Sequence, residues 1–319
     1  MPAESDLKLP VSILQGHHLV AFKTSLTGIL ATNRAEDTYA QIIDGMPTAD
    51  VWDEYANRRH EWIENHKQLC PTTWETTKAF QANFNHDELH LNASAMQAYQ
   101  NTPVGSRPFL MRLIELTAIA CHEIAVFLFQ NVDGGHHKGC ETWKPKPILI
   151  WPYGASEPVA QPVPEPPPTV FFHRSYQDHD QYPNGVADMV GYWAESRLFG
   201  GVVLFDRGPE EVDTRDVFIH PYEPHRLIFQ LSDAQIQQFA DFALPLSLSP
   251  SQRPVSPFPF KAERQTRRVD PWDAMTTLHI FRNRYERKLP ARRVYNCVLH
   301  PEDYPEIEDQ MKTIRERFI

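Results

Sequence analysis

The stretch that most constrains the fold is a run of apolar residues from Arg107 to Gln130. Pro108 suits the first turn of a helix, where its missing N–H is not needed. Apolar residues recur at helical spacing and also fill most of the other sides. A helix that is apolar nearly all round is buried in the core of its protein. The run therefore predicts a long central helix, ended at Gly134 or Gly135, where glycine can take a positive φ.

This run is not expected to cross a membrane. It has 24 residues, and its charged and ionisable side chains make it a poor bilayer span: Arg112, Glu115, His122 and Glu123. No other stretch is apolar for long enough, so we expect no membrane span.

The dipeptide His122-Glu123 is the strongest functional clue. Burying two such side chains costs several kcal/mol unless they are paired, ligated or solvated by a pocket. A zinc-peptidase helix has the pattern His-Glu-x-x-His, in which both histidines bind the metal and the glutamate activates a water molecule. Val126 stands at the position of the second histidine. The pattern is therefore half present, and the missing half is a metal ligand.

Charge and cysteine usage exclude several classes of protein. The net charge is −10 and the pI is about 5.8, with no basic stripe, so a nucleic-acid partner is not expected. The four cysteines lie far apart and read as free thiols in a reducing compartment. No apolar signal segment follows Met1. These features predict a cytoplasmic protein.

The remaining chain predicts short strands and helices in alternation. Residues 1–40 read as an N-terminal arm with strands at 11–14 and 18–22, and 36–69 read as helical. We expect one small mixed sheet, on which the central helix packs, from 88–93, 201–206, 216–220 and 226–231. Further helices are expected within 182–201 and over 232–243, where Ser232 is a suitable N-cap. The C-terminal part is a basic extension, with a last strand over 292–299 and a charged helix over 301–319.

Proline is unusually frequent, with 28 prolines against 13 glycines. Aromatic residues are interleaved throughout, which favours long ordered loops over disorder. We expect these proline-rich segments to run over the surface of one α+β domain that spans 1–319.

Two motifs together resemble a family of uncharacterised fungal proteins that are similar to zincin-type metallopeptidases. These have His-Glu-x-x-His, then Gly-Glu-Ser-Gly and Glu-x-x-Leu-Phe-Gly-Gly downstream. The residues that carry the resemblance are His122, Glu123, Gly191, Glu195, Leu198, Phe199, Gly200 and Gly201. The resemblance covers about residues 85–230 and implies a zincin-like fold.

Two departures from the family pattern remove metal ligands. Val126 replaces the second histidine, and Met189 stands where the family has its first downstream glutamate. Catalytic zinc needs three protein ligands and an open position. We therefore expect no metal at this site, no stoichiometric zinc in the purified protein and no cofactor.

The favoured hypothesis is an enzyme of natural-product biosynthesis on a degraded zincin scaffold. It would bind a hydrophobic reactive intermediate and steer a metal-independent cyclisation, isomerisation or pericyclic step, which needs shape and a few hydrogen-bond donors. His122 and Glu123 are the candidate catalytic residues. The candidate substrate-binding residues are Val126, Phe129, Met189, Tyr192, Trp193 and Glu195.

Three other interpretations stay open. The chain is a zinc hydrolase with unusual ligands, namely His122, Glu195 and either His136 or His137. Alternatively, it is an inactive scaffold that binds a protein through its proline-rich loops. In the third interpretation His122 and Glu123 are structural, with Arg197 as a partner for Glu123. Substrate identity and oligomeric state are not predicted.

Overall fold

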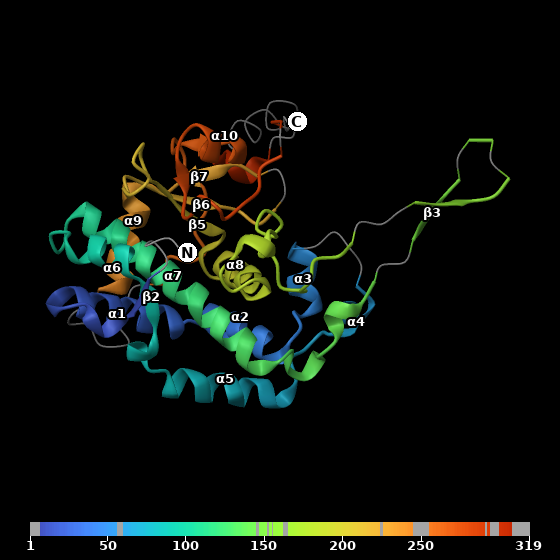
Figure 1. Ribbon diagram of the computed structural model, residues 1–319, viewed down its shortest axis with the longest axis horizontal. Helices are drawn as coiled ribbons and strands as arrows, with labels where there is room; N and C mark the ends of the chain where they lie inside the picture. Colours follow the sequence, from blue (N-terminus) through green and yellow to red (C-terminus); the bar gives the residue numbers. More distant parts are fainter. Residues whose placement is uncertain are drawn as a thin grey trace, which may run out of the picture.

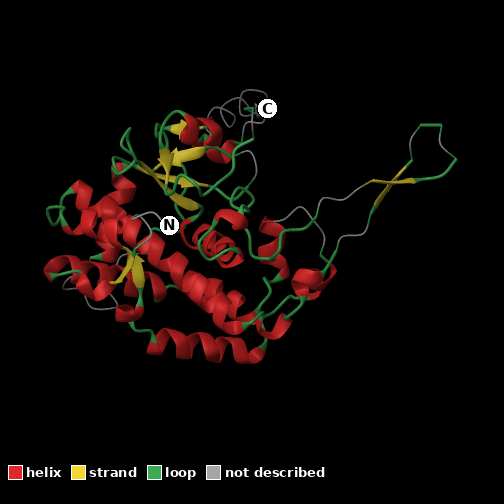
Figure 2. Ribbon diagram, viewed as in Figure 1, coloured by secondary structure: helices red, strands yellow, loops and turns green. Residues whose placement is uncertain are grey.

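The chain folds into an α+β structure in which helices predominate and an antiparallel sheet covers one side (Figures 1 and 2). The computed structural model describes residues 7–307 except 56–59, 145–146, 152, 155, 162–164, 224–225, 245–254, 291 and 294–299. The helices are α1 (Gly16–Leu30), α2 (Asn33–Asp44), α3 (Ala49–Tyr55), α4 (Glu61–Asn65), α5 (Pro71–Asn83), α6 (Ala93–Gln100), α7 (Arg107–Val132), α8 (Val186–Phe199), α9 (Asp233–Ala243) and α10 (Pro271–Thr276).

The main sheet has five strands in the order β8-β7-β6-β5-β9, and every neighbouring pair is antiparallel. The prediction of a mixed sheet was therefore wrong. Its strands are β5 (Val202–Asp206), β6 (Val217–His220), β7 (Ile228–Gln230), β8 (Arg268–Val269) and β9 (Ile280–Phe281). The predicted segment 88–93 is not part of it, because β2 (His90–Asn92) pairs with β1 (Lys8–Pro10) instead.

The central helix α7 forms where the sequence predicts it. Ser106 caps its start by accepting a hydrogen bond from the backbone N–H of Phe109, and Gly134 and Gly135 beyond its end both take positive φ. Contrary to the expectation, α7 does not pack mainly on the sheet. It packs against α8, which in turn lies on β5. The two helices are therefore the middle layer of the protein (Figure 1).

By length and composition α7 could cross a membrane, and it is the one such helix in the described part of the chain. Its most apolar window is 72% buried inside the protein. Burial in a core accounts for its apolar surface.

Helix α8 separates two groups of core residues. Val190, Trp193 and Leu198 belong to the larger group, which includes the buried side chains of α1, α2 and α7. Met189 and Tyr192 belong to the smaller group, which includes Val202 and Leu204 of β5. Strand β5 follows the same division, because alternate residues of a strand point to opposite faces. Nearly every side chain of α8 is therefore buried, including its charged ones.

The N-terminal part differs from the prediction. The strand predicted at 18–22 lies inside α1, which packs against α7 and α9. Gly16, with positive φ, directly begins this helix.

One proline-rich segment also differs from a surface loop. β3 (Ile148–Ile150) pairs with β4 (Val159–Gln161), and this hairpin extends away from the rest of the protein (Figure 1). The predicted strand over 292–299 and helix over 301–319 lie mostly outside the described residues.

Candidate functional site

The imidazole of His122 lies between two carboxylates of α8. Its Nδ1 is 2.8 Å from Oε1 of Glu195, and its Nε2 is 3.0 Å from Oδ1 of Asp188. Asp188 and Glu195 are seven residues apart, so two helical turns place them on the same face of α8. All three side chains are buried. His122 thus joins the two helices at the centre of the protein.

A fourth charged residue completes this cluster. Nη1 of Arg282, which follows β9, donates to Oε1 of Glu195 at 2.7 Å. The guanidinium also lies 5.1 Å from the ring centre of Tyr192, a cation–π arrangement. His122, Asp188, Glu195 and Arg282 are called the His122 network below. It holds two positive and two negative charges when His122 is protonated.

The network fits because Gly191 has no side chain. A Cβ atom at this position would lie 2.4 Å from Nε2 of His122. Tyr192 closes the other side, with its ring edge-on to the imidazole at 4.8 Å between ring centres. The imidazole therefore occupies a closed slot on the surface of α8.

Hydrogen bonding sets the protonation of the network. Burial alone would lower the pKa of His122, but the hydrogen bonds to Asp188 and Glu195 outweigh it and raise the pKa to about 9. Burial would raise the pKa of Asp188, but its hydrogen bond with His122 and those from Asn184 lower it to about 2. His122 is thus an imidazolium at neutral pH, and both ring nitrogens donate.

This arrangement does not fit a zinc ion at His122. Both ring nitrogens already bind carboxylates, and Val126 offers no donor atom. The Arg282 cation on Glu195 would repel a metal ion bound there. A protonated and doubly paired histidine is also a poor general base, because it has no free lone pair. What the network can do is hold α7, α8 and the segment after β9 together through charge-assisted hydrogen bonds.

The network predicts a specific pH dependence of stability. Protonated His122 stabilises the fold fully below its ordinary pKa of about 6.5, and this contribution disappears as the pH rises through about 9. Ionised Asp188 contributes above about pH 4 and loses its contribution as the pH falls through about 2. Urea unfolding should therefore show a loss on the order of 3 kcal/mol between about pH 6 and pH 10. A His122→Ala variant that loses just as much over this range would contradict the assignment.

Of the other predicted site residues, Tyr192 contacts His122, whereas Glu123 and Trp193 face elsewhere. Glu123, one residue along α7, points away and pairs with Lys8 at 2.6 Å, not with Arg197. Tyr192 does contact His122, but Trp193 packs on Phe171 in the other core group. The remaining three residues are placed as follows: Val126 and Met189 are buried, and Phe129 is partly buried at the edge of the helical core.

The sequence indicated His122 and Glu195 as site residues and Gly191 as part of the family resemblance, but it did not indicate Asp188 or Arg282. The resemblance placed Met189 at the position of a family glutamate, whereas the carboxylate that reaches His122 is Asp188, one residue earlier. Its spacing of seven from Glu195 was an available signal. No local sequence pattern indicated Arg282, because it lies 87 residues from Glu195 in the sequence.

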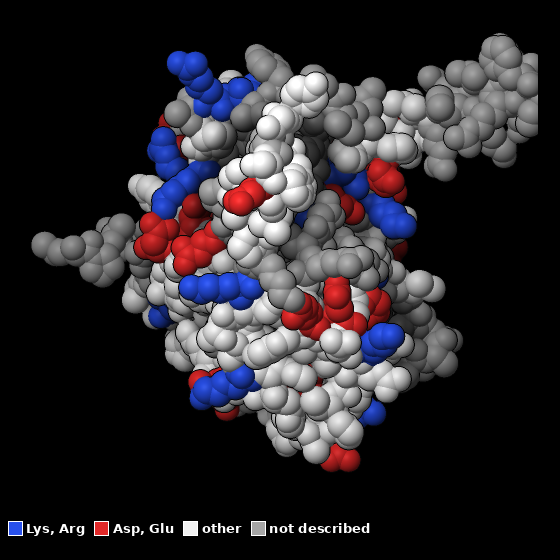
Figure 3. Space-filling view, turned by 90° about the vertical axis from the view of Figure 1, so that its right-hand side faces the viewer, with Lys and Arg blue, Asp and Glu red and all other residues white. Residues whose placement is uncertain are grey.

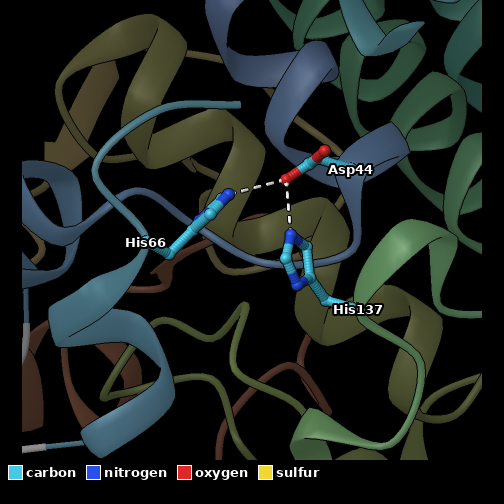
Figure 4. Close-up of side chains that lie close together, drawn as sticks. All are labelled: Asp44, His66 and His137. Carbon is cyan, nitrogen blue, oxygen red and sulfur yellow. Dashed lines mark ion pairs between the residues drawn. The ribbon is translucent and has the colours of Figure 1, made fainter. Parts of the chain in front are cut away.

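A second cluster was not predicted as a unit. Asp44, His66 and His137 come from the end of α2, the residue after α4, and the short 3-10 helix η4 (Gly135–His137). Figure 4 shows both imidazoles directed at the carboxylate, and one ligand atom from each lies within 4.8 Å of the others. His137 was weighed as a zinc ligand together with His122, but the structure brings it to Asp44 instead. Among the described residues, this is the cluster that could hold a metal.

The chain also has a large cavity beside the last turn of α8. Its volume is about 1110 Å³, and it lies between α8, the start of α2, the β6–β7 connection and the segment 259–262. None of the predicted site residues lines it. Ser196 and Arg197 of α8 and the adjacent Gly200 do line it. Helix α8 therefore carries both carboxylates of the His122 network and part of the wall of this cavity.

Comparison with known protein families, curated proteins and solved structures gave no match for this chain. The zincin-like fold thus stays a prediction, while the class of an α+β protein with a long buried helix is established by the structure.

Proposed function

We propose that this protein is an enzyme of small-molecule biosynthesis that binds a largely apolar, acidic substrate in the 1110 Å³ cavity. The observation that carries the proposal is the combination of aromatic walls with basic side chains around one cavity. The proposed substrate is hydrophobic, as expected from the sequence, but its proposed binding site is this cavity and not the surroundings of His122.

The walls suit an apolar substrate body. They include Tyr222, Phe229 and Phe260, together with prolines at 221, 259, 301 and 305. Ligand sites are typically lined by apolar and aromatic groups with a few polar groups that orient the ligand. Aromatic side chains supply large contact area at fixed positions.

The charges suit an acidic substituent. Four basic side chains line the cavity against three acidic ones, in a chain whose net charge is −10: Arg34, Arg197, Arg226 and Lys261 against Asp37, Glu223 and Glu302. The first turn of α2 also lines it, and a helix N-terminus carries partial positive charge. Arg197 is paired with Asp37, and Arg226 with Glu223 and Asp303. A carboxylate or phosphate group would therefore be attracted mainly by Lys261 and the start of α2.

Such a cavity can steer a rearrangement without a metal. Cyclisation, isomerisation and pericyclic steps depend on holding the substrate in a reactive shape, and fixed cationic donors stabilise charge that develops on it. In this proposal the His122 network positions α8, and through it Arg197, rather than exchanging protons with the substrate.

A charge reversal at the rim tests the proposal. The exposed side chain of Lys261 lines the cavity, so Lys261→Glu should weaken binding of an acidic ligand about tenfold or more without unfolding the protein. Wild type and variant would be incubated with a small-molecule extract of the producing cells. Mass spectrometry would then measure which compounds are retained and which are converted.

Lys78→Glu is the matched control, because Lys78 is also exposed but lies on α5, outside the cavity lining. Wild type and Lys78→Glu should retain and convert the same acidic compound, and Lys261→Glu should not. Equal retention by all three proteins would contradict the proposed site. If a compound is retained but not converted, the result would instead favour the interpretation that the protein is an inactive scaffold that only binds.

A further inference from the structure

We propose that Asp44, His66, Cys70 and His137 form a structural zinc site. The proposal concerns residues remote in the chain from the His122 network and does not depend on the proposed function. It replaces the expectation of a zinc-free protein, because that expectation rested on Val126 near His122.

The distances from Asp44 to the two histidines and from His137 to Cys70 are close to the edges of a zinc tetrahedron. Oδ2 of Asp44 lies 2.9 Å from Nε2 of His66 and 3.1 Å from Nε2 of His137. Sγ of Cys70 lies 3.6 Å from Nε2 of His137. With zinc bonds of about 2.0–2.1 Å to nitrogen and oxygen and about 2.3 Å to sulfur, tetrahedral edges are about 3.3 Å, and about 3.6 Å to the sulfur. One ion therefore reaches the donor atoms of Asp44, His66 and His137 after shifts of a few tenths of an ångström. The Cys70 thiol lies outside this three-residue group and joins it by a larger movement of its side chain.

Two buried atoms at the centre of this cluster lack a hydrogen-bond partner among the described residues. Oδ2 of Asp44 and Nε2 of His66 are buried, and neither has a hydrogen-bond partner among the described residues, although they lie close together. Their approach thus lacks the alignment of a hydrogen bond. Buried polar atoms of this kind are rare and mark a missing partner such as an ion.

The surrounding contacts orient the donors as they do in metal sites. Nδ1 of His66 lies 2.9 Å from the carbonyl oxygen of Pro47, which assigns the proton to Nδ1 and leaves Nε2 for a metal. Oδ1 of Asp44 accepts from the hydroxyl of Thr73 at 2.6 Å and from the backbone N–H of Cys70 at 3.1 Å. The carboxylate is thereby held with Oδ2 facing the two histidines.

Two glycines allow the loop that carries His137 to reach Asp44. A Cβ atom at Gly45 would lie 1.9 Å from the carbonyl oxygen of Gly134, and one at Gly135 would lie 2.4 Å from that of Ile43. Both residues also have positive φ. Side chains are therefore excluded at both positions, and the backbone packs closely enough to complete the donor set.

The donor types select zinc over other common metals. Two imidazoles, one carboxylate and one thiolate in a tetrahedral arrangement suit Zn²⁺, whereas Mg²⁺ and Ca²⁺ prefer oxygen ligands. Cys70 would bind as the thiolate and release its proton to solvent. Four protein ligands leave no open position, so the ion joins α2, the start of α5 and η4 rather than activating water.

Metal analysis with matched histidine variants tests the site. Protein purified without a metal-affinity step or chelator should contain about one zinc per chain. His137→Ala should lower the zinc content at least about tenfold. His136→Ala is the control, because His136 is the neighbouring residue and contacts Thr72 outside the cluster. A zinc-free wild type after dialysis against Zn²⁺, or equal zinc in both variants, would overturn the proposal.

Two further measurements keep the test decisive if His137→Ala does not fold. His137→Cys supplies another zinc ligand and should regain zinc, whereas a folded but zinc-free His137→Cys would count against the site. Replacing zinc by Co²⁺ in the wild type should give a thiolate-to-cobalt absorption band that Cys70→Ser lacks. Absence of this band in the cobalt-loaded wild type would overturn the assignment of Cys70.

Discussion

Replacing His122 by alanine is expected to lower the free energy of unfolding by about 3–5 kcal/mol. The imidazolium separates Asp188 from the Glu195–Arg282 pair, and both carboxylates are buried. Removing it leaves Asp188 at a buried position without its cationic partner, with only the hydrogen bonds from Asn184. A buried charge without compensation is among the costliest changes a mutation makes.

Urea unfolding at neutral pH would measure this loss, with His17→Ala as the control. His17 is exposed at the start of α1 and should change stability by less than about 0.5 kcal/mol. An unchanged stability of His122→Ala together with lost turnover would instead restore His122 as a catalytic acid or base. The measurement therefore separates the structural from the catalytic interpretation of the dipeptide.

Much of the helical framework was predictable because its signals are local. In α7, Ser106 and Pro108 define the start, while the end comes at Asp133, which takes positive φ one residue before the glycines from which the end was predicted. The capping box of Ser232 and Gln235 likewise marks α9. Helix α1 also has a local signal, since its apolar residues Phe22, Leu26 and Ile29 recur at helical spacing.

The sheet and both clusters were harder to predict, because they depend on residues far apart in the sequence. β8 and β9 are two residues long each and carry no periodicity of their own. Arg282 reaches Glu195 from 87 residues away. Asp44 and His137 lie in separate segments, and no spacing motif connects them. Apolar periodicity identifies which face of a helix is buried, but it does not identify the charged partner that a buried histidine finds there.

Gly191→Ala is expected to destabilise the protein by about 3 kcal/mol or more, although alanine normally favours a helix. The added Cβ would lie 2.4 Å from Nε2 of His122 and 2.5 Å from two ring carbons. Overpacking alone costs about 1–3 kcal/mol. Displacing the imidazole would also break its hydrogen bond with Asp188. Gly28→Ala is the matched control, because Gly28 lies inside α1 and its Cβ would meet Phe242 at 3.7 Å, an ordinary contact.

Gly28→Ala should leave stability unchanged or raise it by about 0.4–1 kcal/mol. The double variant His122→Ala/Gly191→Ala identifies the cause of the Gly191 effect. Without the imidazole, the new methyl group fills part of the vacated space, so the double variant should be more stable than the sum of the single losses by about 1–3 kcal/mol. Additive losses would mean that Gly191 is needed for a reason other than the His122 ring. A coupling of this size would show, from stability measurements alone, that residue 191 must be glycine to leave room for the His122 ring.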